Sequence, residues 1–167
     1  MSTEAMTATV DAAEAFGAMQ FIWREAEILD RLDYKAWLPL WSQDGLYIIP
    51  TEFGVKDHAD ALNVAYDDAE MREARVKRLR SGFSMSASPP ARTVRTISRF
   101  VFERDGDVLV VRSAMQIAEY KFERLSTIAA DVEHHLEAAE DGQWRIGRKV
   151  VTLVNADDYL HGIGYLF

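Results

Sequence analysis

The second half of the chain contains four long runs of β-forming residues, Thr93–Arg104, Val108–Phe122, Ser126–Glu140 and Trp144–Val154. The Asp-Gly turn signals "RDGD" and "EDGQ" lie between the first and second runs and between the third and fourth. Strands that follow one another with short turns pair antiparallel. The pattern therefore predicts a long antiparallel meander, on which the remaining elements have to pack.

The first half of the chain is mainly helical. From Asp11 to about Leu32 apolar residues recur at three- and four-residue steps, which indicates an amphipathic helix. A short helix is expected at "YKAWLPLW", bent or ended by Pro39, and another at "DDAEMREARVKRLRS", before Gly82. "GLYIIP" and "ALNVAY" are expected to be strands. This order predicts an α+β fold, with N-terminal helices packed on one face of a curved, mainly antiparallel sheet.

The expected strands differ in how apolar their two faces are. Ser126–Glu140 has an apolar face, which includes His134, and a charged face, as is typical of a half-buried strand. Val108–Phe122 and Trp144–Val154 instead carry apolar residues on both faces. One face would pack on the helices, and a small domain has no second layer for the other. We therefore expect the outer face to be covered by another subunit.

Composition limits the class of protein. The chain has 167 residues, of which 49% are hydrophobic, and this suits one domain. We place residues 1–12 in a flexible N-terminus and residues 13–167 in that domain. No apolar run approaches the ~20 residues that span a bilayer, and no secretory pattern precedes the first helix, so we expect a cytoplasmic protein without membrane contact. Cysteine is absent, which excludes disulfides and iron–sulfur clusters ligated by this chain.

The basic residues are concentrated in one segment, although the chain is acidic, with a net charge of -8. Between positions 72 and 99, eight Lys or Arg residues accompany a single acid, Glu73. Domains that bind nucleic acid are usually basic overall, because phosphate contacts supply much of the affinity. We therefore expect no nucleic-acid partner. The segment suits ion pairs within the chain or at a protein interface.

Three arginines of the first long strand are candidate interface residues: Arg92, Arg95 and Arg99. Strand alternation would place Arg95 and Arg99 on one face, and Phe100 and Phe102 on the other face, toward the helices. Arginine is enriched at interfaces, where its stem adds apolar contact. The alternative is a solvated strand face and helix end, since exposed ion pairs contribute little to stability.

The four histidines are not spaced like metal ligands. A site of two histidines and one carboxylate needs two imidazoles that converge on one point. His134 and His135 are adjacent on a strand and point to opposite faces. His58 lies in an early loop and His161 lies near the C-terminus. We therefore expect no metal site in this chain.

His134 is the histidine on an apolar strand face, and it has two interpretations. It is either a core histidine with a hydrogen-bond partner, or a general acid or base in a cavity between the helices and the sheet. In the second case Asp30, Asp33 or Tyr47 could share the cavity, and a His/Asp pair could drive a dehydration or an isomerisation. Phosphate-binding glycine loops and serine nucleophile elbows are absent from the sequence.

Four stretches in order resemble the small (beta) subunits of aromatic-ring-hydroxylating dioxygenases. They are "FIWREAEILDRLDYKAWLPLWSQDGLYIIP", "AYDDAEMREARVKRL", "PPARTVRTISRFVF" and "WRIGRKVVTLVNADDYL". Matching elements include Glu25 and Ala26 in the first stretch and Lys149 in the last. The chain departs from the family pattern at Arg99, where asparagine is usual, and at Ala91, where serine is usual.

The resemblance implies a cystatin-like cone, the fold of nuclear transport factor 2, which ketosteroid isomerases and scytalone dehydratase share. It also implies that the chain is a mainly structural beta subunit without a cofactor or catalytic residue of its own. In such oxygenases an alpha subunit carries the Rieske [2Fe-2S] cluster and the mononuclear iron. The expected assembly is alpha3beta3 with beta–beta trimer contacts, and the expected role is in the catabolism of aromatic compounds.

Two other functions remain open because one fold hosts many activities. The first is a stand-alone enzyme of the dehydratase or isomerase type, which would use His134 with Asp30 or Asp33. The second is a free-standing oligomeric protein that binds a small apolar ligand.

Overall fold

The computed structural model of the chain describes residues 9–82, 89–157 and 164–167. Within these ranges six strands form one sheet, in the order β2-β1-β6-β5-β4-β3. Neighbouring strands are antiparallel except β1 and β6, which run parallel. In chain order, the elements are helix α1 (Ala12–Asp30), helix α2 (Tyr34–Trp37), the 3-10 helix η1 (Leu38–Leu40), strands β1 (Trp41–Pro50) and β2 (Asn63–Asp67), helix α3 (Ala69–Arg80), and strands β3 (Arg92–Asp105), β4 (Val108–Lys121), β5 (Arg124–Ala138) and β6 (Trp144–Leu153).

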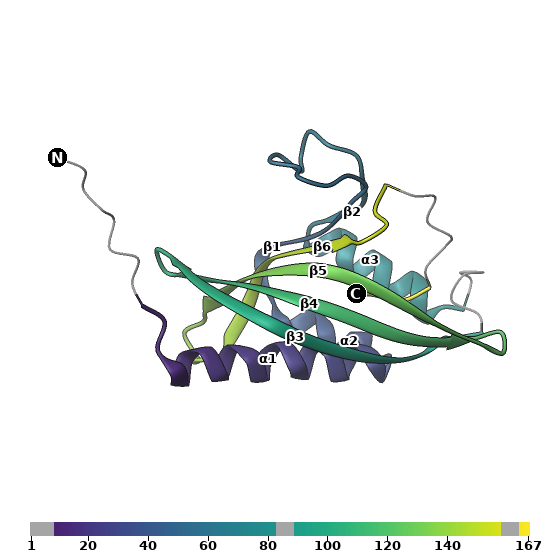
Figure 1. Cartoon of the computed structure of the whole chain (residues 1–167), viewed down its shortest axis with the longest axis horizontal. Helices are drawn as coiled ribbons and strands as arrows, with labels where there is room; N and C mark the ends of the chain where they lie inside the picture. Colours follow the sequence, from purple (N-terminus) through teal and green to yellow (C-terminus); the bar gives the residue numbers. More distant parts are fainter. Residues whose placement is uncertain (1–8, 83–88, 158–163) are drawn as a thin grey trace.

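The helices lie against one face of a curved sheet, and α1 runs along the side where β3 forms the sheet edge (Figure 1). The predicted α+β class and the predicted meander of β3 to β6 are therefore confirmed. The helices and strands lie close to the positions expected from the sequence. Residues 1–8 of the expected flexible N-terminus, and His161, lie outside the described ranges.

Helix α1 starts with a side-chain cap and ends on the sheet. Oδ1 of Asp11 accepts a hydrogen bond from the main-chain N–H of Glu14 at 2.8 Å, which satisfies a free donor of the first turn. The buried residues of α1 form one stripe; they are Ala18, Ile22, Glu25, Ala26 and Leu29. Beside this stripe, Trp23 donates its indole N–H to the carbonyl oxygen of Ile97 at 3.3 Å. This bond fixes α1 to β3.

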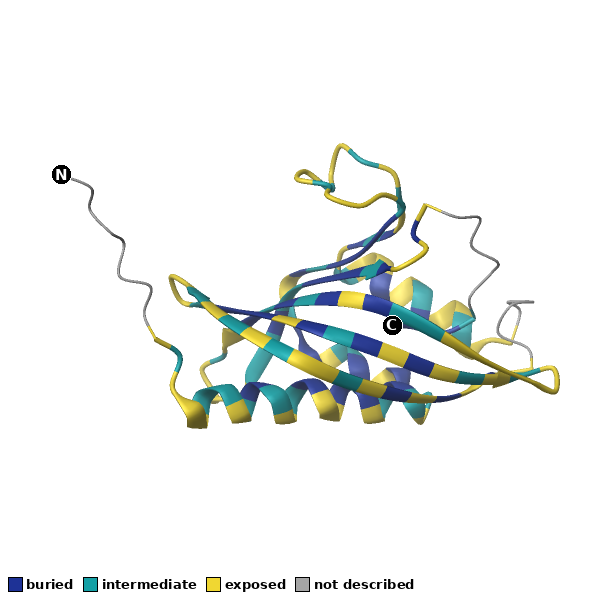
Figure 2. Ribbon diagram, in the orientation of Figure 1, coloured by how far each residue is buried: buried dark blue, intermediate teal, exposed yellow. Residues whose placement is uncertain are grey.

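The hydrophobic core lies between the helices and the inner face of the sheet, where buried and exposed residues alternate along each long strand (Figure 2). The inward residues of the two central strands are Leu109, Val111, Met115 and Ile117 on β4 and Ala130, Val132, His134 and Leu136 on β5, none more than 4% exposed. These inner faces are as predicted. On the outer face of β4, Val110 is buried, whereas Ala118 and Tyr120 are exposed in the single chain.

The strict alternation expected along Trp144–Val154, with Ile146 and Val150 on one face, is wrong beyond Ile146. The pairing of β6 with β5 shifts register at Gly147, which is an extra residue in the strand. Such a bulge reverses the alternation of side chains. Lys149 and Val151 therefore point inward, and Val150 lines the outer face.

A second bulge changes the predicted face of the arginines on β3. The pairing of β3 with β4 shifts register after Ser98, and Arg99 has a left-handed φ of 54°. Arg95 therefore points toward the helices and is 8% exposed, whereas Arg99 lies on the outer face. The expectation that these two arginines share a face is wrong. Phe100 and Phe102 pack against the core, as expected.

Strands β4 and β5 are joined by a two-residue turn that lacks the usual sequence signal. Lys121 pairs with Arg124, and the residues between them, Phe122 and Glu123, have φ values of 50° and 60°. Positive φ at both central positions is the type I′ hairpin turn, which Asn-Gly favours. A bulky side chain adopts this conformation at a cost.

We expect the double substitution Phe122→Asn, Glu123→Gly to raise the thermal unfolding midpoint. It relieves left-handed strain of about 1 kcal/mol or more. For a chain of this size that corresponds to about 2–4 °C, which circular dichroism can measure. Gly106→Ala is the opposite change, because Gly106 has a φ of 58° in the β3–β4 turn, and it should lower the midpoint. An unchanged midpoint in the double variant would contradict the expectation of strain.

Candidate functional site

A buried carboxylate on α1 is bonded to three other elements. Oε1 of Glu25 accepts from the indole N–H of Trp37 on α2 at 2.9 Å and from Nζ of Lys149 on β6 at 2.8 Å. Its Oε2 lies 2.8 Å from Nε2 of His134 on β5. All four residues are at most 2% exposed. They are referred to below as the Glu25 cluster.

The Glu25 cluster balances one anion with one cation. Burial by itself would raise the pKa of Glu25, but the Lys149 ammonium and the His134 imidazole outweigh it, so this pKa is well below its usual range. Burial lowers the pKa of His134, although Glu25 opposes this effect. The imidazole is therefore neutral at pH 7 and donates its Nε2–H to Glu25. Burial also lowers the pKa of Lys149, again against the pull of Glu25.

Residues 164–167 are anchored to the same interior. Nζ of Lys149 donates to the main-chain oxygen of Phe167 at 2.7 Å. The N–H of Phe167 donates to the hydroxyl oxygen of Tyr47 on β1 at 3.0 Å, and the guanidinium of Arg95 donates to the main-chain oxygen of Leu166. Burial raises the pKa of Tyr47, so its hydroxyl stays protonated. This segment thus joins β1, β3 and β6 through their polar side chains.

Asp30 and Asp33, the two aspartates considered as partners of His134, form their hydrogen bonds elsewhere. Asp30 accepts from the main-chain N–H of Arg95 at 2.9 Å and forms an ion pair with the Arg95 guanidinium. Asp33 caps α2 by accepting from the main-chain N–H of Ala36 at 3.3 Å. No hydrogen bond or ion pair joins either aspartate to His134 within the described ranges. A His/Asp pair of the expected kind is therefore not formed.

His134 instead has Glu25 as its partner. Tyr47 lies beside the Glu25 cluster, opposite Lys149 in the pairing of β1 with β6 and with its ring centre 5.5 Å from that of Trp37, but within the described ranges no hydrogen bond joins it to His134. The core-histidine interpretation agrees with this geometry. Glu25 was not among the predicted site residues. The available signal was a carboxylate three positions after Ile22, inside the apolar stripe of α1, because a buried acid needs a partner.

Several basic residues of the segment between positions 72 and 99 have partners within the chain. Arg72 donates to the carbonyl oxygen of Gly45, and its guanidinium lies 4.3 Å from the ring centre of Trp41. Arg75 forms an ion pair with Asp67 on β2. With Arg95, these residues show that part of the basic segment stabilises the fold itself.

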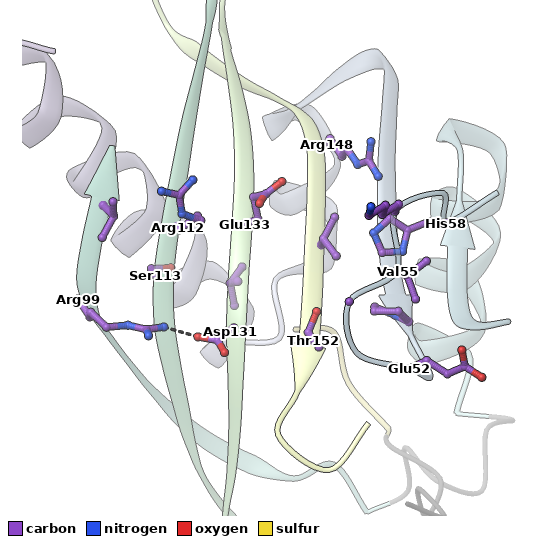
Figure 3. Close-up of a pocket in the computed structure, with 16 residues that line it drawn as sticks. Glu52, Val55, His58, Arg99, Arg112, Ser113, Asp131, Glu133, Arg148 and Thr152 are labelled. Carbon is purple, nitrogen blue, oxygen red and sulfur yellow. Dashed lines mark hydrogen bonds and ion pairs between the residues drawn. The ribbon is translucent and has the colours of Figure 1, made fainter. Parts of the chain in front are cut away.

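The outer face of the sheet carries an open groove of about 530 Å³, which the loop after β1 borders on one side (Figure 3). Its charged lining residues are Glu52, Lys56, Arg99, Arg112, Asp131, Glu133 and Arg148. Arg99 forms an ion pair with Asp131 across the groove floor, drawn as a dashed line in Figure 3. The groove lies on the side of the sheet opposite to the Glu25 cluster.

The described residues do not form a metal site. Over residues 9–82, 89–157 and 164–167, no group of three or more His, Cys, Asp or Glu side chains is placed to hold a metal ion. His134 faces the core, whereas His135 lies on the other side of β5 and bonds to Glu133 at 2.6 Å. In the same part of the chain, no helix has the length and apolar character needed to span a membrane.

Comparison with known proteins gives a family match over most of the chain. The family model described as "Ring hydroxylating beta subunit" matches residues 24–157. The anthranilate 1,2-dioxygenase small subunit of Acinetobacter baylyi is 34% identical over 87 residues, which cover 49% of this chain and 53% of that protein. The matched stretch therefore spans about half the length of that curated relative.

Solved structures give matches over nearly the full length. The beta subunit of benzoate 1,2-dioxygenase from Burkholderia mallei superposes with a TM-score of 0.74 at 27% identity, covering 95% of this chain and 99% of that chain. Naphthalene 1,2-dioxygenase with indole bound in its active site superposes with a TM-score of 0.81 at 19% identity, covering 96% and 89%. The second match shows similarity of fold alone.

The predicted cystatin-like fold is confirmed by a further match. A Nostoc punctiforme protein described with a cystatin-like fold superposes with a TM-score of 0.60 at 15% identity, covering 86% of this chain and 93% of that chain. At this identity the match shows the fold and nothing about activity.

Lys149→Met should destabilise the chain by about 3–5 kcal/mol, because it leaves the carboxylate of Glu25 buried without its cation. Urea unfolding followed by circular dichroism measures this loss. The double variant Glu25→Gln, Lys149→Met removes both charges and should recover much of the lost free energy. If the single variant is no less stable than the double variant, the buried pair is not coupled as described.

The free energy of unfolding should fall as the pH decreases below the ordinary histidine pKa of 6.5. The pKa of His134 is lowered in the folded chain, so the unfolded chain binds the proton first and stability is lost as the pH falls. Below pH 4.5, the ordinary pKa of a glutamate, protonation of Glu25 in the unfolded chain lowers the free energy of unfolding further. His134→Gln should make the slope between about pH 6.5 and 5 shallower, by at most about 1.4 kcal/mol per pH unit. Equal slopes in the two proteins would disprove this assignment.

Proposed function

We propose that this chain, which belongs to the ring hydroxylating beta subunit family, is the structural subunit of an aromatic-ring-hydroxylating dioxygenase. The observation that carries the proposal is the family match over residues 24–157. The similarity to the beta subunit of benzoate 1,2-dioxygenase over 95% of this chain supports it. In the proposed assembly an alpha subunit carries the Rieske [2Fe-2S] cluster and the mononuclear iron, and performs the oxygenation in the cytoplasm.

The sequence does not fit a Rieske cluster, and the residues that the structure describes do not fit a mononuclear iron site. A Rieske cluster needs two cysteine thiolates, and the sequence has none. A mononuclear site needs two convergent histidines, and His134 and His135 diverge. In the proposed function, this chain supports and positions a partner subunit that holds the iron centres.

The geometry of the Glu25 cluster supports a structural role over the stand-alone dehydratase or isomerase. Both oxygens of the carboxylate and Nε2 of His134 are already bonded to each other or to protein donors. Phe167 is buried beside the cluster and accepts a hydrogen bond from Lys149. The bonded atoms would have to exchange their partners before they could act on a substrate. Nδ1 of His134 has no partner among the described residues, but it is buried from solvent, so a substrate could reach it only if the core opened.

The outer face of the sheet is the proposed surface for beta–beta contacts in an alpha3beta3 assembly. Val94 and Val101 on β3 are 65% and 46% exposed in the single chain. Arg92 is exposed and stacks over the Tyr120 ring at 4.8 Å, and the Arg99 side chain is 62% exposed. Exposed apolar residues interleaved with arginine suit an interface. Arg92 and Arg99 remain the predicted interface residues, whereas Arg95 is buried inside the chain.

The test is co-expression of the tagged chain with a dioxygenase alpha subunit from the same organism, followed by affinity purification and iron analysis. We expect iron to elute with the alpha subunit. Arg99→Glu should weaken assembly by about 2 kcal/mol or more if a desolvated contact is lost. It also breaks the pair with Asp131, so the charge-swapped variant Arg99→Asp, Asp131→Arg is the control, since it restores that pair within the chain.

The swapped variant should still assemble poorly, because the charge that faces the partner is reversed. Assembly equal to wild type in both variants would place Arg99 outside the interface. Purification of this chain free of any alpha subunit, after co-expression of both soluble proteins, would contradict the proposed function as a whole.

A further inference from the structure

The groove on the outer face of the sheet combines apolar walls with cationic side chains. Pro50, Val55, Val101 and Val150 contribute apolar lining, and the loop of residues 51–62 forms one border. The volume of about 530 Å³ is within the range of small-molecule sites, about 300–1,000 Å³. Its charges therefore determine which class of molecule fits.

Most charged groups around the groove are paired within the chain. Asp131 pairs with Arg99. Glu133 is 2.6 Å from His135. Arg112 donates to Glu103 on β3 at 2.9 Å. In each of these pairs the opposite charges offset each other. The charge that a ligand should carry is therefore determined by the groups that have no such partner.

The side chains of Arg148 on β6 and His58 in the loop each have a buried nitrogen without a hydrogen-bond partner among the described residues. Nε of Arg148 and Nδ1 of His58 are both buried from solvent and unbonded within the described ranges. The two side chains lie at the border where β6 meets the loop, as Figure 3 shows. Buried donors without an acceptor are costly, and an arginine guanidinium is suited to a carboxylate. Glu52, the other acid that lines the groove, is exposed and forms no ion pair within the described ranges.

We propose that this groove is a binding site for a small organic carboxylate, held by Arg148 and His58 through its charged end and by Val101 and Val150 through its apolar body. The guanidinium of Arg148 and the imidazole of His58 supply the hydrogen-bond donors, and the valines supply the apolar surface. The site is separate from the Glu25 cluster, which lies on the inner face. It shares Val101 and Arg99 with the surface proposed for beta–beta contacts, so the inference concerns the chain before assembly and is tested on the chain alone.

A bound carboxylate should also change the protonation of His58. Burial and then the positive charge of Arg148 on β6 lower the pKa of His58, while Glu133 on β5 and Asp57 in the loop raise it less. A carboxylate beside the imidazole favours the imidazolium, so binding takes up a proton. Affinity should therefore increase as the pH falls from about 7.5 to about 6, and this dependence should disappear in His58→Phe.

The experiment titrates sodium benzoate into the full chain and follows methyl and amide signals by nuclear magnetic resonance. We expect saturable shifts at Val101 and Val150, with a roughly millimolar dissociation constant for so small a molecule. Benzamide has the same size and no charge, and it should bind at least tenfold more weakly. Arg148→Gln should lose about tenfold or more in benzoate affinity, because a charge-assisted hydrogen bond is removed. Arg124→Gln, an exposed arginine at the far end of β5, is the matched control and should bind like wild type.

Three results would overturn the proposal. The first is the absence of saturable shifts up to the solubility of sodium benzoate. The second is equal binding of benzoate and benzamide, which would show that the groove takes only the apolar body. The third is wild-type affinity in Arg148→Gln when that variant is folded, as its circular dichroism spectrum can establish. A pH-independent affinity in the wild-type chain would remove His58 from the site.

Discussion

The buried carboxylate of Glu25 is the interaction on which the arrangement of helices and sheet depends. An ionised carboxylate is costly to bury, and it is tolerated here because Trp37, His134 and Lys149 all donate to it. These donors come from α2, β5 and β6. Together with the bonds from Trp23 and Asp30 to β3, a carboxylate that must meet three donors defines one position of α1 on the sheet. The cluster thus fixes how the helical layer lies on the meander.

The two bulges distribute the charges between the interior and the surface. The bulge at Gly147 turns Lys149 toward Glu25. The bulge at Arg99 sends Arg95 inward, to Asp30 and the main chain of Leu166, and leaves Arg99 outside. The interior is therefore held together by ion pairs that are closed within the chain, while the outer sheet face keeps arginine, histidine and apolar groups accessible. This division agrees with a subunit whose external surface carries its function.

The main features of the fold could be predicted from the sequence because they are local. Alternation and Asp-Gly turns determine the strands of the meander, and three- and four-residue steps determine α1. The bulge at Gly147 had a signal that was not used, because an isolated glycine inside a strand pattern suggests a bulge. Arg99 carries no such signal in its residue type. The tight turn at Phe122 and Glu123 was missed because its residues are not those that favour left-handed φ.

The candidate site was predicted only in part. His134 was correctly expected on the apolar face of its strand. Its partner was not, because a carboxylate on a helix and a histidine on a strand 109 positions later have no spacing rule that links them. The inward position of Lys149 was not predicted, because simple alternation from Ile146 places Lys149 on the outer face and the bulge at Gly147 reverses this order. The family was recognised from several weak motifs in the right order, and no one of these motifs would have been specific enough alone.

The hydrogen bond between Glu25 and Lys149 also has a consequence for the order of folding. It joins residues 124 positions apart, and the bond between Tyr47 and Phe167 joins residues 120 apart. Contacts of such long range are entropically expensive to close and slow the folding of a chain. During synthesis α1 emerges long before β6, so its carboxylate stays hydrated until the last strand arrives. Desolvation of that one charge therefore belongs among the final steps, when the helical layer and the completed sheet come together.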